Sequence, residues 1–78
     1  MVIYLGQYDD ARKTYEIALA LDPLDPAANG GLGRALYSMG QVESGKIYLM
    51  KAIESYRHDG NYLMAAEIDK ILLSMSGH

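Results

Sequence analysis

The feature that most constrains the fold of this chain is an internal repeat with a period of 34 residues. A shift by one period superimposes four identical pairs: Gly6 on Gly40, Gln7 on Gln41, Ala18 on Ala52, and Asp25 on Asp59. Further pairs are similar: Tyr8 with Val42, Asp9 with Glu43, Arg12 with Lys46, Tyr15 with Leu49, and Leu19 with Ile53. A unit of this length cannot bury its apolar face alone, so neighbouring units must stack against one another.

Residues 9–21 have the apolar spacing of a single helix. One stripe with a period of 3.6 residues contains Ala11, Tyr15, Ala18 and Leu19. Asp9 and Asp10 place negative charge at the start of this segment, where the helix dipole favours it, and Pro23 prevents further propagation. We therefore expect a helix that begins at Asp9.

Gly6-Gln7 occupies the same place in its repeat as Gly40-Gln41, and both pairs are predicted to form tight turns between helices. Only residues 1–5 precede the first turn, about one helical turn where a hairpin needs three or more. We expect either that the chain is a piece of a longer array or that a partner supplies the missing helix.

Three further helices are expected. Asp25 followed by Pro26 is typical of an N-cap with proline at the first helical position, and this helix should run to about residue 39, before Gly40. The next helix should end near residue 57, and its apolar stripe contains Val42, Gly45, Leu49, Ala52, Ile53 and Tyr56. The last helix is expected over residues 59–75, beginning at Asp59, one period after Asp25.

The phase of the last helix has an alternative. Gly60-Asn61-Tyr62 followed by Ala65 imitates Gly6-Gln7-Tyr8 followed by Ala11, which would make this segment the second helix of a hairpin rather than the first. The in-phase interpretation is preferred because it leaves no missing hairpin partner inside the chain.

The repeat resembles the tetratricopeptide repeat (TPR), a helix-turn-helix unit of the same length. The residues that carry the resemblance are Gly6 to Ala11, Tyr15, Ala18-Leu19, Pro23, Leu32-Gly33, Gly40 to Val42, Leu49 and Ala52-Ile53. The chain departs from the family pattern at four positions: Asn29 stands in place of Trp, Leu36 in place of Tyr, Gly45 in place of Ala, and Arg57 in place of Pro.

The resemblance implies an all-α fold of about four helices, in antiparallel hairpins that stack as a right-handed solenoid. It divides the single domain into a truncated first repeat (1–24), a full second repeat (25–58), a closing helix (59–75) and a tail (76–78). It also implies a scaffold, not an enzyme, that holds a peptide or helix of a partner protein in a concave groove.

Asn29 to Gly33 contains three glycines, each costing about 0.5–1 kcal/mol in a helix interior. Gly33 is expected at a close helix contact. Gly30 and Gly31 either admit a ligand or reflect relaxed local packing. The predicted partner-binding groove consists of Ala27, Gly30, Gly31, Arg34, Tyr37, Ser38, Met64 and Ile68.

The incomplete first repeat leads to the alternative function, self-association into a homo-oligomer. Its apolar stripe would lack the helix that normally covers it, and soluble monomers rarely expose such a patch. The predicted self-association surface consists of Tyr4, Tyr8, Ala11 and Tyr15.

Composition excludes several other classes of function. The net charge is −3 and the seven Lys and Arg are scattered, which counts against nucleic-acid binding. No apolar run could cross a membrane and the first residues do not resemble a signal peptide, so a cytoplasmic protein is expected. Cysteine is absent, and His58 and His78 lack the partners of a metal site. No cofactor, metal ion or catalytic residue is predicted.

One prediction concerns stability. Because glycine is a poor helix former, Gly45→Ala is expected to stabilise the chain by about 0.5–1 kcal/mol.

Overall fold

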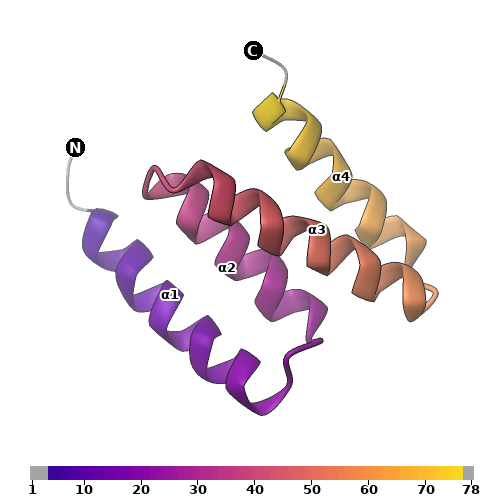
Figure 1. The fold of residues 1–78 in the computed structure, drawn as a ribbon, viewed down its shortest axis with the longest axis horizontal. Coiled ribbons are helices and arrows are strands. Elements are labelled where there is room, and N and C mark those ends of the chain that lie inside the picture. Colours follow the sequence, from indigo (N-terminus) through magenta and orange to yellow (C-terminus); the bar gives the residue numbers. More distant parts are fainter. Residues whose placement is uncertain (1–3, 77–78) are drawn as a thin grey trace.

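The computed structural model describes residues 4–76, with the side chains of residues 7–75, and this part of the chain holds four α-helices and no strand (Figure 1). The helices are α1 (Tyr4–Leu21), α2 (Pro26–Ser38), α3 (Val42–His58) and α4 (Tyr62–Ser76). Each runs antiparallel to the one before it, as the repeat predicts (Figure 1).

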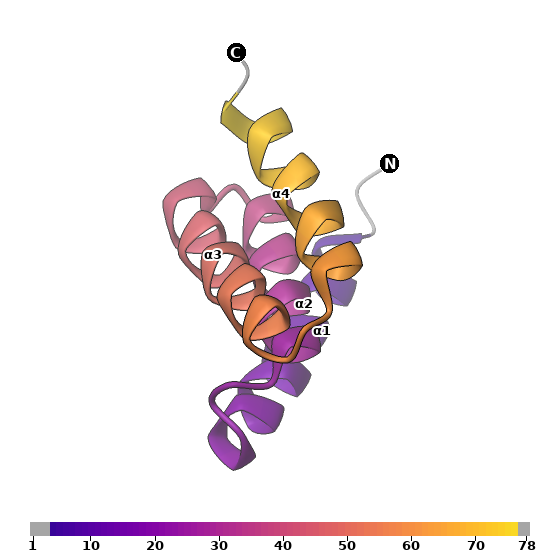
Figure 2. The same ribbon diagram turned by 90° about the vertical axis from the view of Figure 1, so that its right-hand side faces the viewer.

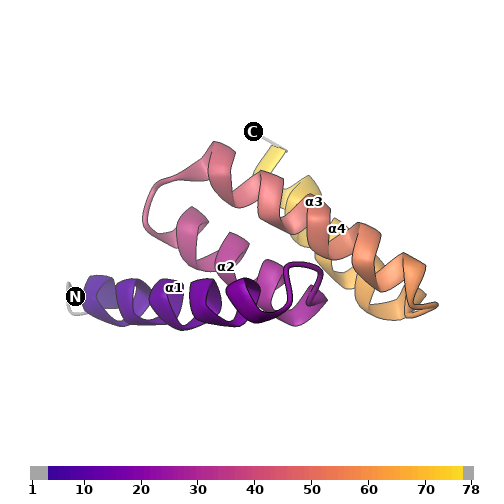
Figure 3. The same ribbon diagram turned by 60° about the horizontal axis from the view of Figure 1, so that its bottom comes forward.

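The four helices form a thin slab with extents of 38 × 34 × 17 Å, seen edge-on in Figure 2. The α3–α4 hairpin slants across the α1–α2 pair (Figure 3). The loop between α2 and α3 lies at one end of the slab, and the other two loops lie at the opposite end (Figure 1).

The corner between α1 and α2 is held by short polar side chains. Asp25 caps α2 as predicted: its carboxylate accepts hydrogen bonds from the backbone N–H groups of Ala27 (3.0 Å) and Ala28 (3.3 Å), and Pro26 opens the helix. The Asp22 carboxylate accepts one from the Leu24 N–H at 3.2 Å, a local turn.

Asn29 explains one departure from the family pattern. Its side chain is buried, and the amide nitrogen donates to the carbonyl oxygens of Pro23 (3.1 Å) and Asp25 (3.2 Å). A buried tryptophan would fill this corner by volume, whereas Asn29 ties the loop to α2 by hydrogen bonds to two backbone carbonyls, of which that of Asp25 also accepts from the Asn29 backbone N–H at 3.0 Å.

The backbones of α2 and α3 approach each other closely at Gly33 and Gly45. A methyl group added at Gly45 would lie 2.7 Å from the Gly33 carbonyl oxygen, and one added at Gly33 would lie 2.8 Å from the Gly45 carbonyl oxygen. The close contact expected at Gly33 is present. The expectation that Gly45→Ala stabilises the chain is wrong, because the contact of the added methyl group with the backbone of α2 costs more than the gain in helix propensity.

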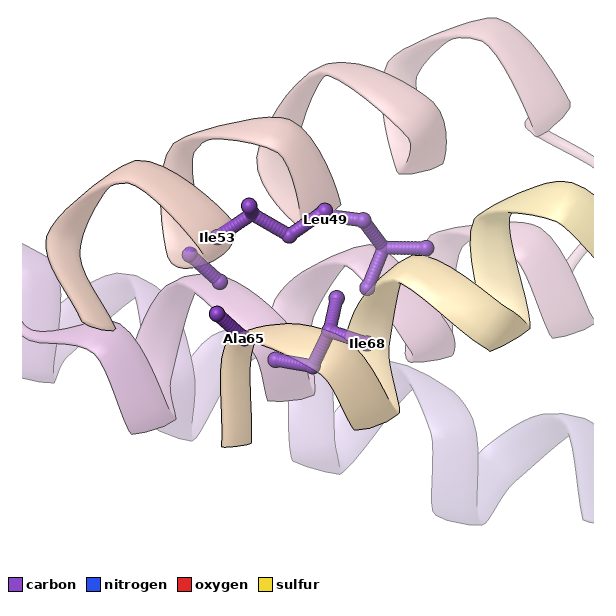
Figure 4. Close-up of a cluster of buried hydrophobic side chains, with 5 residues drawn as sticks. Leu49, Ile53, Ala65 and Ile68 are labelled. Atoms are coloured by element: carbon purple, nitrogen blue, oxygen red, sulfur yellow. The ribbon is translucent and has the colours of Figure 1, made fainter. Parts of the chain in front are cut away.

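The main apolar cluster lies between α3 and α4 (Figure 4). Leu49 and Ile53 of α3 meet Ala65 and Ile68 of α4, with Ala52 completing the cluster, and Leu49 is fully buried. A second set of buried residues belongs to α2: Ala28, Leu32, Ala35 and Leu36. Since α2 contacts both α1 and α3, this helix joins α1 to the α3–α4 hairpin.

The predicted turn at Gly6 is absent. α1 runs without interruption from Tyr4 through Gly6, Asp9 and Asp10 to Leu21, so the helix does not begin at Asp9. A glycine lowers the stability of a helix by only about 1 kcal/mol relative to alanine, which is not enough by itself to end the helix. At the Gly40 turn, by contrast, the glycine has φ of 90° and the Gln41 N–H donates back to the Leu36 carbonyl at 2.8 Å.

The last helix begins at Tyr62, not at Asp59 as predicted. Residues 59–61 repeat the geometry of residues 39–41: Gly60 has φ of 80°, and the Asn61 N–H donates to the Tyr56 carbonyl at 2.8 Å. Asn61 rather than Asp59 serves as the N-cap, accepting from the Met64 N–H at 3.3 Å. Gly60 and Asn61, on which the out-of-phase interpretation of the last helix was based, thus form the turn that precedes α4.

Candidate functional site

A hollow of about 360 Å³ lies on the surface between α1 and α2. It is lined by Tyr8, Ala11 and Tyr15 from α1 and by Gly31, Arg34, Ala35 and Ser38 from α2. These residues recur at helical spacing along two antiparallel helices, so the hollow follows the groove between them.

Tyr15 and Gly31, which both line the hollow, are in contact with each other. A methyl group at Gly31 would overlap the phenol ring of Tyr15, so the glycine makes room for the ring. Tyr15 is half-buried there, whereas Tyr8 remains 36% exposed. The lining of the hollow therefore includes an aromatic ring packed against a glycine.

Charge is distributed unevenly around the hollow. On α1, Arg12 pairs with Asp9 (2.8 Å) and Glu16 (2.9 Å), and the hydrogen bond from Arg12 lowers the pKa of the Asp9 carboxyl. On α2, Arg34 is exposed, and no acidic side chain of residues 7–75 pairs with it. Arg34 thus presents an uncompensated cation at the rim.

The structure places the eight predicted groove residues in three groups. Gly31, Arg34 and Ser38 line the hollow. Gly30 and Ile68 are buried against each other, since a methyl group at Gly30 would lie 3.3 Å from Ile68 Cδ1. The exposed residues outside the lining of the hollow are Ala27, Tyr37 and Met64.

Gly30 and Gly31 therefore serve packing between helices. Ile68 from α4 covers Gly30, and Tyr15 from α1 covers Gly31, so a ligand backbone cannot lie against Gly30 without displacing Ile68. The expectation that these two glycines admit a ligand is corrected for Gly30. At Gly31 a ligand would meet the Tyr15 ring as well.

Three of the four predicted self-association residues, Tyr8, Ala11 and Tyr15, line this same hollow, where they face α2. Tyr4 opens α1, and its side chain lies outside the described part of the structure. The described self-association residues and three of the predicted groove residues, Gly31, Arg34 and Ser38, thus meet in one hollow. Ala35 also lines it and was not predicted, although its spacing from Gly31 and Ser38 is helical.

A second hollow, of about 410 Å³, lies where the loop before α2 meets the end of α3. Its lining consists of Leu24, Glu54, Ser55, His58 and Asp59. His58 Nδ1 lies 3.8 Å from the Asp59 carboxylate, and both side chains are exposed. Within residues 7–75, no group of three His, Asp or Glu side chains is placed to hold a metal ion.

Across residues 4–76, none of the helices combines the length and apolar character that crossing a bilayer requires.

Comparison with known proteins supports the repeat that the sequence contains. A family model described as tetratricopeptide repeat matches residues 3–67. No curated protein and no solved structure gives a significant match. Proteins of this family are typically non-catalytic scaffolds for protein–protein interaction. The matched segment spans most of the chain, which therefore belongs to the tetratricopeptide repeat family.

Proposed function

We propose that this chain is a non-catalytic scaffold that binds a helix or peptide of a partner protein in the hollow between α1 and α2. The proposal rests on one observation: α1 and α2 together line this hollow. The residues from α1 are Tyr8, Ala11 and Tyr15, and those from α2 include Gly31, Arg34 and Ser38. Aromatic residues and arginine are enriched among the residues that contribute most of the binding energy in protein–protein interfaces.

The chemistry of the groove favours a partner with apolar anchors. Its lining includes the Tyr15 ring against Gly31, and its charge comes from Arg34, which can take a carboxylate in bidentate fashion. A strongly basic segment would be repelled by Arg34. An amphipathic helix or an apolar extended peptide fits these properties.

Self-assembly through α1 is the second candidate. The apolar side chains of this helix that a second copy would meet at the hollow are Tyr8, Ala11 and Tyr15, of which Tyr8 is 36% exposed. Apolar side chains along a helix favour association with a second copy of the chain when they form a continuous patch.

Photo-cross-linking tests both candidates. With benzoylphenylalanine in place of Ser38, which lines the hollow, irradiation in an extract of the source cells should give one discrete cross-linked partner. The matched control carries the same group in place of Lys51, an exposed residue of α3 outside the hollow, and should give none. A product with twice the mass of the chain would favour self-assembly. Equal products from both positions would contradict a specific site at the hollow.

A further inference from the structure

One helix of the chain already sits in a seat formed by two others. α2 packs against α3 and α4 through its glycines: Gly33 faces Gly45 and Leu49, and Gly30 faces Ala52 and Ile68. The seat for α2 therefore includes Gly45, Leu49 and Ala52 from α3, and Ile68 from α4.

The repeat places a second copy of this seat between α1 and α2. One period of 34 residues earlier, the four seat residues become Ala11, Tyr15, Ala18 and Arg34. Three of these, Ala11, Tyr15 and Arg34, line the hollow between α1 and α2. The packing supports this register: Tyr15 lies against Gly31, and one period later Leu49 belongs to the same buried cluster as Ala65.

The seat between α1 and α2 is uncovered, whereas the seat formed by α3 and α4 is covered by α2. Ile68 is buried under α2, whereas its counterpart Arg34 is exposed. Leu49 is fully buried, whereas its counterpart Tyr15 is only half-buried. Among residues 4–76, no helix covers the hollow in the way that α2 covers α3 and α4.

We infer that the occupant of this hollow is an α-helix of a partner protein with an acidic residue three positions before a glycine or alanine. This inference rests on the proposed scaffold function. The small residue would face Ala11, as Gly33 faces Gly45, and is needed because Ala11 carries a methyl group that Gly45 lacks, so the two helices would lie farther apart than α2 and α3. The acidic residue would take the place of Gly30 and meet Arg34, which replaces the apolar Ile68 of the filled seat.

The same pattern argues against a second copy of this chain as the occupant. Within the four helices and their caps, an acidic residue stands three positions before a glycine or alanine only at Asp25 and Ala28. Asp25 already caps α2 with its carboxylate. None of the four helices within residues 4–76 therefore offers the required pair from its interior.

A peptide copy of α2 provides the probe. It comprises residues 26–38 with Gly30→Glu to meet Arg34 of the chain, and with Arg34→Gln so that the peptide has no internal ion pair. A hydrocarbon staple joins positions 31 and 35, which would face away from the seat, because a helix this short is marginal in water. The control peptide has Gly30→Lys and is otherwise identical.

Binding of both peptides is measured by calorimetry on the full chain and on its Arg34→Glu variant. Arg34 is exposed, so the variant should fold normally. The Glu peptide should bind the unmodified chain at least about fivefold more tightly than the Lys peptide, and the order should reverse on the variant. A third peptide with Gly33→Leu should lose binding to both chains, because the close approach is blocked.

Equal affinities of the two peptides for both chains, or binding of neither, would overturn the inference. If the cross-link at Ser38 still forms in that case, the scaffold function stands and the partner segment differs. If that cross-link is absent as well, both proposals fail.

Discussion

Replacing Gly45 with alanine is expected to lower the free energy of unfolding by about 1–3 kcal/mol, despite the better helix propensity of alanine. The added methyl would lie 2.7 Å from the Gly33 carbonyl oxygen and 3.0 Å from the Tyr37 backbone nitrogen. Both obstacles are backbone atoms, which cannot rotate away, so α2 and α3 would have to separate. Urea unfolding followed by circular dichroism measures the change.

Ser44→Ala is the matched control, because Ser44 is the exposed neighbour in the same helix. That change should alter stability by less than about 0.5 kcal/mol. Gly33→Ala should destabilise as Gly45→Ala does, since it meets the Gly45 carbonyl oxygen and Leu49 from the other side. A Gly45→Ala chain at least as stable as the original would show that the helices do not approach this closely in solution.

Leu49→Ala is expected to have the largest effect, a loss of about 3–4 kcal/mol. Leu49 is fully buried in the cluster that joins α3 to α4, and it also contacts α2 at Gly33. Its removal leaves a cavity where three helices meet. A domain of this size is stable by only about 4–12 kcal/mol, so the variant should unfold at a much lower urea concentration.

Two variants distinguish the cavity from a general loss of apolar surface. Ile47→Ala, on the same helix but 53% exposed, should cost less than about 0.5 kcal/mol. Leu49→Met, which keeps most of the volume, should cost less than about 1.5 kcal/mol. A Leu49→Ala chain as stable as the Ile47→Ala chain would contradict the packing of α4 on α3.

The sequence was sufficient to predict the class of the fold and most helix ends. The cap at Asp25 and the turn at Gly40 were predictable because each depends on residues within a few positions along the chain. Gly6 failed as a turn signal because a single glycine allows a helix to end without requiring it. The start of α4 was missed because identity across one period favoured Asp59, while the local signal at Gly60 and Asn61 decided the turn.

The candidate site was only partly predictable, for a reason of geometry. Gly31, Arg34 and Ser38 are close in sequence, and one helix face identifies them. That Tyr8, Ala11 and Tyr15 form the opposite wall depends on how α1 lies against α2. The contact of Gly30 with Ile68 likewise requires α4 to reach across to α2, which no local pattern specifies.

Intermolecular nuclear Overhauser effects between the stapled Glu peptide and the full chain test the central claim most directly, because they locate the bound helix. A partner helix seated between α1 and α2 should give contacts from the peptide to the Ala11 methyl group and to the Tyr15 ring. The chain also exposes apolar side chains on α4, at Leu63 and Leu73. Contacts to Leu63 and Leu73, with none to Ala11 or Tyr15, would contradict the assignment of the hollow as the binding site.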